Sequence, residues 1–215
     1  MHEPDGADEP VGDDAADDAT GADDPAGAEE QPPLEAPDKG ELKTLPSLIL
    51  VNTGHGKGKS TAAFGTILRA VALGWPVAVV QFLKSGDWRV GEEKICRELG
   101  VDWYAAGDGF TWNSDDIDES RAKAQAAWEM AANLLVAGDH RLLVLDEISY
   151  AMIWHWIDAG DVAEALSSRP EQVNVILTGR DMPQPIIDVA HTVTEMTKVK
   201  HAFDAGYVAK KGIDY

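Results

Sequence analysis

Short apolar runs alternate with longer segments of helical periodicity along this chain, from about residue 45 to residue 196. Aliphatic and β-branched runs predict strands at 45–52, 77–82, 101–105, 141–146, 173–178 and 192–196. Amphipathic and alanine-rich segments predict helices at 59–73, 91–99, 118–137, 161–168 and 185–190. Strands that alternate with helices are typical of a mostly parallel sheet with helices on both faces, so we expect the α/β fold class.

A glycine-rich segment lies between the first predicted strand and the first predicted helix. It reads Thr53-Gly54-His55-Gly56-Lys57-Gly58-Lys59-Ser60-Thr61. Glycines let a loop fold tightly enough to direct its N–H groups at phosphate oxygens, and the following helix adds its positive end. Lys59 would add a charge, and Ser60 a hydroxyl ligand for Mg²⁺. The plainer interpretation is a turn with solvated lysines, but the strand before it and the helix after it favour a P-loop that binds a nucleoside triphosphate.

The predicted strand at 141–146 ends in two carboxylates, Asp146 and Glu147. In P-loop proteins an acidic residue at the end of a neighbouring strand holds the Mg²⁺ that bridges the phosphates. Adjacent residues of a strand point to opposite sides, so the two carboxylates should have different roles. An acidic turn that closes the strand is the alternative, and the P-loop upstream favours the metal site.

Arg180 follows the predicted strand at 173–178 in the segment Thr178-Gly179-Arg180. Ligands of open α/β sheets bind at the carboxyl ends of the strands, so Arg180 would reach the triphosphate. A surface arginine explains the same pattern equally well. Both interpretations stay open at the level of sequence.

Phe110 and Trp112 are two large aromatic residues in a polar, glycine-containing stretch. They either cover a flat apolar ligand or anchor the loop in the core. The single cysteine, Cys96, has the pattern of a packing residue on a helix, and the six histidines lack the spacing of a zinc site. Trp154 and Trp156 are expected in core or dimer packing.

Charge is unevenly distributed along the chain, whose net charge is −20. Residues 1–41 hold fifteen carboxylates, one lysine and almost no large apolar residue, which predicts a disordered acidic tail before a domain at 42–215. No basic stripe is present to neutralise a nucleic-acid backbone. Without an apolar run of about 20 residues or a secretory signal, we expect no membrane partner and a cytoplasmic protein.

Taken together, these segments resemble the P-loop type of ATP:corrinoid (cob(I)alamin) adenosyltransferase, the family that makes coenzyme B12. The resemblance runs from about residue 47 to residue 215. It rests on the loop with its extension to Gly65, on Gly109-Phe110-Thr111-Trp112, on Val144-Leu145-Asp146-Glu147, on Thr178-Gly179-Arg180, and on the C-terminal segments 199–206 and 212–215. The family also lacks the first glycine of the ordinary P-loop, where this chain has Thr53. His55 and Ser60 stand where the family more often has Asn and Thr, and the acidic tail replaces its helical N-terminal segment.

The resemblance implies a single P-loop (RecA-like) domain that transfers the 5′-deoxyadenosyl group of ATP to the Co(I) of a corrinoid and releases triphosphate. It implies Lys59, Phe110 and Trp112 as catalytic residues, with the two aromatics displacing the lower axial ligand of the corrinoid. Asp146, Glu147 and Ser60 would hold Mg²⁺. A homodimer and an electron-donating reductase are the implied partners.

Two other functions share parts of this pattern. An ordinary P-loop ATPase or kinase would use Lys59, Ser60 and the carboxylates to cleave the γ-phosphate, and would leave Phe110 and Trp112 without a role. A non-catalytic, nucleotide-gated corrinoid carrier would keep both sites and show no turnover.

Overall fold

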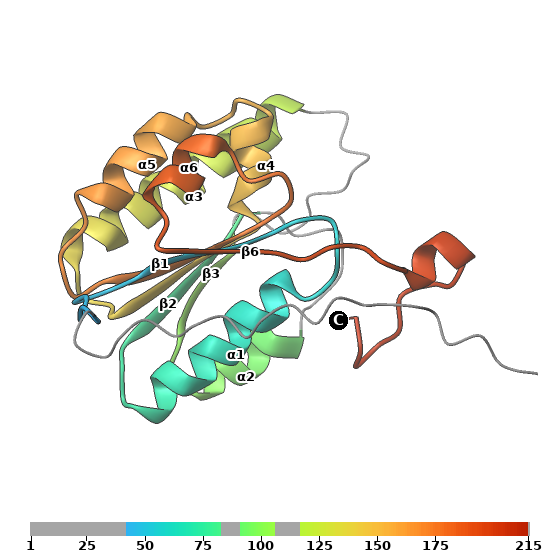
Figure 1. Ribbon diagram of the computed structural model, residues 1–215, viewed down its shortest axis with the longest axis horizontal. Coiled ribbons are helices and arrows are strands. Elements are labelled where there is room, and N and C mark those ends of the chain that lie inside the picture. Colours follow the sequence, from blue (N-terminus) through green and yellow to red (C-terminus); the bar gives the residue numbers. More distant parts are fainter. Residues whose placement is uncertain (1–41, 83–90, 106–116, 215) are drawn as a thin grey trace, which may run out of the picture. The chain divides into compact units, whose positions relative to one another are not determined.

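The computed structural model describes residues 42–82, 91–105 and 117–214, and its residues from Thr44 onward belong to one compact unit (Figure 1). The predicted acidic tail at 1–41 lies outside the described residues, and so do Phe110 and Trp112.

A six-stranded parallel sheet forms the centre of this unit. Its strands are β1 (Ile49–Thr53), β2 (Val77–Gln81), β3 (Asp102–Ala105), β4 (Leu142–Asp146), β5 (Asn174–Thr178) and β6 (Thr192–Glu195). Their spatial order is β3-β2-β4-β5-β1-β6. The predicted parallel α/β fold is therefore confirmed. The strand that ends in Asp146 was expected directly beside the P-loop strand, but β5 lies between β4 and β1.

Helices cover both faces of the sheet. They are α1 (Lys59–Ala72), α2 (Gly91–Glu98), α3 (Ile117–Ala137), α4 (Ile148–Ile153), α5 (Ala159–Ser167) and α6 (Gln184–Val189), and a 3₁₀ helix, η1, follows at Ala202–Ala205. In Figure 1, α1 and α2 lie on one face, and α3, α4, α5 and α6 lie on the other. No helix in the described part of the chain combines the length and apolar character that crossing a bilayer requires.

Two hydrophobic cores result from the alternation of side chains along the strands. Val79 and Val144 pack with α1 and α2 on one face, whereas Val80 and Leu145 pack with α3 and the later helices on the other. Because successive residues of a strand point to opposite faces, strands buried on both sides need continuous apolar runs. Every residue of β2 and β4 is buried accordingly.

Three residues that the sequence assigned to packing, Cys96, Trp154 and Trp156, lie in or beside the hydrophobic cores. Cys96 of α2 is buried in the core on the α1 side of the sheet, and burial raises the pKa of its thiol. Trp154 and Trp156 contact each other with ring centroids 4.8 Å apart at the edge of the other core. Helix α4 was not predicted from the sequence, because six residues directly after a strand give too short a periodic signal.

Because the strands are parallel, the predicted functional segments all lie at the carboxyl-terminal end of the sheet. The glycine-rich loop follows β1, Asp146 ends β4, and Thr178 ends β5. Since neighbouring strands lie about 4.8 Å apart, these three adjacent ends lie within reach of one bound triphosphate.

Candidate nucleotide and metal site

The loop between β1 and α1 has the backbone of an anion-binding turn. Gly54 and Gly58 have positive φ values of 92° and 113°, a region that other residues rarely adopt. Gly58 is the N-cap of α1 and supplies no side-chain hydrogen bond to the first turn. The N–H groups and the positive end of this 14-residue helix are therefore directed at the loop without a capping side chain.

The chain immediately after β6 packs against this loop, which the sequence did not indicate. The N–H of Gly56 donates a 2.6 Å hydrogen bond to the carbonyl oxygen of Met196. A methyl group on Gly54 would lie 2.6 Å from the same oxygen, and one on Gly56 would lie 2.7 Å from it. Glycine is thus needed at both positions because another backbone passes so close.

Lys59 is half-buried at the start of α1. Its Nζ donates a 2.7 Å hydrogen bond to the carbonyl oxygen of Gly56 and so lies against the loop. Burial lowers the pKa of Lys59, the positive charge of Arg180 lowers it further, and nearby carboxylates oppose both effects. A bound anion would stabilise the Lys59 ammonium here, because burial has removed part of the water that solvates it.

Asp146 is buried at the end of β4. Its Oδ1 accepts a 2.7 Å hydrogen bond from the Thr178 hydroxyl, and its Oδ2 accepts one of 3.2 Å from the Gln81 amide. Burial raises the pKa of Asp146, and hydrogen bonds from Thr178, Ser60 and Gln81 oppose that rise. The Ser60 hydroxyl at the start of α1 therefore lies near the Asp146 carboxylate at the end of β4.

Glu147 has a left-handed backbone, with φ of 58°, which is uncommon for a residue other than glycine. Its N–H donates a 2.9 Å hydrogen bond to the Thr178 hydroxyl, which helps to hold this turn. Burial and the neighbouring Asp146 raise the pKa of Glu147 to about 7, although Lys59 and Arg180 lower it. The two carboxylates thus have different settings, since Asp146 ends β4 and Glu147 precedes α4, and both lie near Lys59. Their opposite orientation on one strand stays a prediction, because Glu147 lies beyond the end of β4.

Arg180 reaches the same region from the end of β5. Its exposed side chain lines the same cavity as His55 and Lys57 of the loop, and its charge lowers the pKa of both Lys59 and Glu147. Gly179 before it has φ of 144°, and a methyl group there would lie 2.0 Å from the Ser149 hydroxyl oxygen. This tight turn directs the chain so that Arg180 borders the loop rather than a distant surface.

His55 and Lys57 pair with acidic residues other than Asp146 and Glu147. His55 Nε2 lies 2.9 Å from Asp181 Oδ1, and Lys57 pairs with Asp214 near the C-terminus. Both residues line a cavity of about 670 Å³, together with Arg180 and residues of the segment after β6. The C-terminal segment therefore forms one wall beside the P-loop, a neighbour that local sequence patterns could not reveal.

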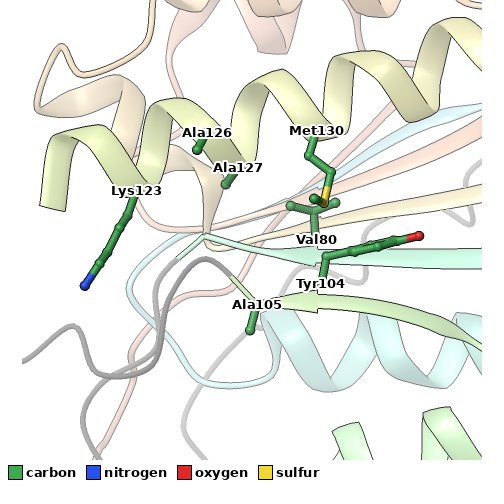
Figure 2. Close-up of a pocket in the computed structure, with 7 residues that line it drawn as sticks. All are labelled: Val80, Tyr104, Ala105, Lys123, Ala126, Ala127 and Met130. Carbon is green, nitrogen blue, oxygen red and sulfur yellow. The ribbon is translucent and has the colours of Figure 1, made fainter. Parts of the chain in front are cut away.

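A smaller cavity of about 260 Å³ lies beneath α3 at the ends of β2 and β3 (Figure 2). Met130 extends from α3 toward Val80 of β2, and Tyr104 extends from β3 across the same space. Lys123 stands at one side of it and pairs with Glu119 at 2.6 Å. Most of its lining is apolar, which makes it chemically distinct from the charged cavity beside the P-loop.

The oxygen groups at the end of β4 fit a magnesium ion. Mg²⁺ prefers hard oxygen ligands, keeps several water molecules, and is commonly held by one or two protein groups together with substrate phosphates. The Ser60 hydroxyl and the buried Asp146 carboxylate supply such groups, and the buried Oε1 of Gln81 has no hydrogen-bond partner among the described residues. The described residues contain no cluster of three His, Cys, Asp or Glu side chains suited to a metal, so the site would depend on phosphate for its remaining ligands.

A strand, a glycine-rich loop, an uncapped helix that begins Lys-Ser, and a buried aspartate two strands away define a P-loop nucleotide-binding protein. Sequence comparisons refine this class. Residues 46–215 match the family described as ATP:corrinoid adenosyltransferase BtuR/CobO/CobP.

Individual relatives agree with that match. The chain is 42% identical over 168 residues to a corrinoid adenosyltransferase of Escherichia coli K12, covering 78% of this chain and 85% of the relative. It is 43% identical over 168 residues to the corrinoid adenosyltransferase CobA of Salmonella typhimurium, with the same shares covered. It is also 43% identical over 170 residues to a corrinoid adenosyltransferase of Pseudomonas aeruginosa, covering 78% and 83% of the two chains. The chain belongs to the ATP:corrinoid adenosyltransferase family.

Proposed function

We propose that this site holds the triphosphate of ATP while the Co(I) of a corrinoid attacks C5′ of the nucleotide. A cobalt–carbon bond forms, the bond between C5′ and its oxygen breaks, and inorganic triphosphate leaves with the bonding electrons. Family membership supports this reaction, which is an adenosyl transfer from ATP to a corrinoid. Co(I) is itself a strong nucleophile, so the reaction requires no general base.

The convergence of the uncapped start of α1, the Lys59 ammonium against the loop and the buried Asp146 is the observation that carries the proposal. It brings the start of α1 and the end of β4 together, directly beside Lys59. In this arrangement Lys59 and the N–H groups of the first helical turn would stabilise the charge that develops on the departing triphosphate. Arg180 would add a second positive charge from the end of β5.

Magnesium would be held by Ser60, Asp146 and Glu147. When bound, the ion would supply positive charge that neutralises the phosphate oxygens. Burial and Asp146 raise the pKa of Glu147 to about 7, and Lys59 and Arg180 offset this rise only in part. A bound cation would further favour the ionised form of Glu147. Thr178 would keep Asp146 directed toward Ser60 through its hydrogen bond.

Phe110 and Trp112 remain the proposed contacts to the corrinoid. Two apolar rings against the lower face of the corrin would displace the lower axial ligand, which makes Co(II) easier to reduce. Hydrophobic side chains suit this role because they occupy the ligand position without binding the metal. Both residues lie outside the described structure, so their role rests on the family resemblance.

We expect a homodimer, a reductase that delivers the electron to Co(II), and a cytoplasmic location where ATP is available. The acidic residues 1–41, which lie outside the described structure, are proposed as a solvating tail before the catalytic domain at 42–215.

Identification of the phosphate product tests the proposed reaction. The protein is incubated with MgATP and a chemically reduced Co(I) corrinoid, and the products are separated by anion exchange. Inorganic triphosphate in equal amount to the alkylated corrinoid supports adenosyl transfer. ADP would instead indicate an ordinary ATPase or kinase, and unchanged ATP would indicate a corrinoid carrier.

A further inference from the structure

Gln81 is the last residue of β2 and is only 5% exposed. It lies opposite Asp146 in the register of β2 and β4, and its Nε2 donates a 3.2 Å hydrogen bond to Asp146 Oδ2. The neighbouring backbone bond, from Phe82 N–H to the Asp146 carbonyl oxygen at 2.9 Å, fixes the two strand ends against each other. The paired strand ends therefore place the Gln81 amide beside the Asp146 carboxylate.

The carbonyl oxygen of this amide has no hydrogen-bond donor among the described residues. Gln81 Oε1 is buried and accepts no hydrogen bond from any described residue. A buried acceptor without a donor is unfavourable, and natural structures provide a donor, a water molecule or an ion in nearly all cases. Because Oε1 and Nε2 share one carbon atom, the free oxygen lies near the carboxylate of Asp146. Two acceptors side by side in a buried place indicate that a donor or a cation belongs between or beside them.

The Ser60 hydroxyl lies near the same carboxylate and helps to keep its pKa from rising further. Thr178 donates to Oδ1 of Asp146, which leaves Gln81 and Ser60 to orient the rest of the group. A magnesium ion held here would retain several water molecules, whose protons need acceptors. Side chains that hydrogen-bond the ligands of a metal commonly change its affinity by about 10- to 100-fold.

We propose that Gln81 is a positioning residue of the magnesium site: its amide N–H holds the Asp146 carboxylate, and its free Oε1 accepts a hydrogen bond from a metal-bound water molecule. This inference rests on the proposed Mg²⁺ site at Ser60 and Asp146. Gln81 contacts neither ATP nor the corrinoid in this role. It lowers the concentration of metal that the enzyme needs.

The test measures metal binding separately from nucleotide binding, in the absence of a corrinoid so that no reaction occurs. Mn²⁺ replaces Mg²⁺, and its affinity for the full-length protein saturated with ATP is obtained by electron paramagnetic resonance titration. The same protein is titrated with ATP at saturating Mn²⁺ and again in the presence of EDTA. Thermal unfolding reports the integrity of the fold.

Gln81→Met keeps the length of the side chain but removes both polar groups, and Gln81→Asn keeps the amide while shortening its reach. Both should bind Mn²⁺ about 10- to 100-fold more weakly while their affinity for ATP in EDTA stays within about twofold of wild type. Gln125→Met is the matched control, since the Gln125 amide donates at 3.1 Å to the Trp156 carbonyl oxygen away from the metal site. It should leave the Mn²⁺ affinity unchanged.

The possible outcomes separate the inference from the function on which it rests. If wild type with ATP binds no Mn²⁺ beyond the amount that ATP binds by itself, the magnesium site fails, and the role of Gln81 fails with it. If wild type binds Mn²⁺ and the folded Gln81 variants bind it equally well, the role of Gln81 alone is overturned. An equal loss of metal affinity, ATP affinity in EDTA and thermal stability would also overturn it, because that pattern belongs to a structural residue.

Discussion

The Thr178 hydroxyl donates a 2.7 Å hydrogen bond to the carboxylate of Asp146, and the pair is buried where β4 and β5 end. The same hydroxyl accepts the N–H of Glu147, so one side chain orders the whole acidic turn. A buried carboxylate stays ionised only when donors offset the loss of water. Thr178 therefore links the stability of the ends of β4 and β5 to the charge of the proposed metal site.

Thr178→Val should weaken both the fold and the reaction. Valine has the same shape, but it leaves Asp146 Oδ1 and the Glu147 N–H without a partner, which costs about 1–3 kcal/mol. Urea unfolding should show this loss, and adenosylation should fall at the same time. Thr66→Val removes a hydroxyl that bonds Ala62 on the exposed face of α1, so it should change stability by less than about 0.5 kcal/mol. Equal stability of the two variants would contradict the ordering role of Thr178.

Lys59→Ala should abolish adenosylation and weaken ATP binding. The variant loses the ammonium that lies against the loop, and with it the main charge partner of the phosphates. Calorimetric titration with MgATP and a corrinoid alkylation assay measure the two effects. Lys94→Ala, on the exposed face of α2, is the control. A wild-type rate in Lys59→Ala would remove the P-loop from the mechanism.

The close approach of Met196 to the loop gives a stability prediction. Gly56→Ala would place a methyl group 2.7 Å from the carbonyl oxygens of Met196 and Thr197, and backbone atoms cannot yield cheaply. We expect a loss of about 1–3 kcal/mol from this overpacking. A methyl group on Gly65, within α1, meets nothing within 4 Å, so Gly65→Ala should gain up to about 1 kcal/mol. If the unfolding temperatures of Gly56→Ala and Gly65→Ala shift in the same direction, Met196 does not pack on the loop as described.

The strands and most of the helices could be predicted from the sequence because their signals are local. The run at 141–146 contains its whole strand β4, and the aspartate that ends the run marks the site. The predicted strand at 45–52 begins earlier than β1, which starts at Ile49, since Pro46 lacks the N–H that a sheet ladder needs.

The missing parts of the site depend on contacts between distant segments. Gln81 and Asp146 meet only because β2 pairs with β4, and Met196 reaches the loop only because β6 pairs with β1. No periodicity within either segment carries that information. The polar residue at the end of the apolar strand 77–82 was the one available signal for Gln81, by the same rule that identified Asp146. The roles of Phe110 and Trp112 stay predictions.

Phe110→Ala and Trp112→Ala should cripple adenosylation when the corrinoid is supplied as Co(II) with a protein or flavin reductant. They should do much less harm when it is supplied as Co(I), because the two rings act on reducibility before the transfer. ATP affinity should stay close to that of wild type. The absorption spectrum of Co(II) corrinoid with MgATP reports loss of the lower ligand, and formation of the four-coordinate species by both variants would make the aromatics ordinary packing residues.

The fate of C5′ tests the central claim most directly. ATP labelled with ¹³C at C5′ is mixed with the wild-type protein, Mg²⁺ and a Co(I) corrinoid, and the carbon spectrum is followed with time. The account predicts that the phosphate-ester signal disappears as a cobalt-bound methylene signal grows, with one triphosphate released for each carbon transferred, and that Lys59→Ala shows neither change. Label that stays on a phosphate ester while ADP accumulates would contradict adenosyl transfer.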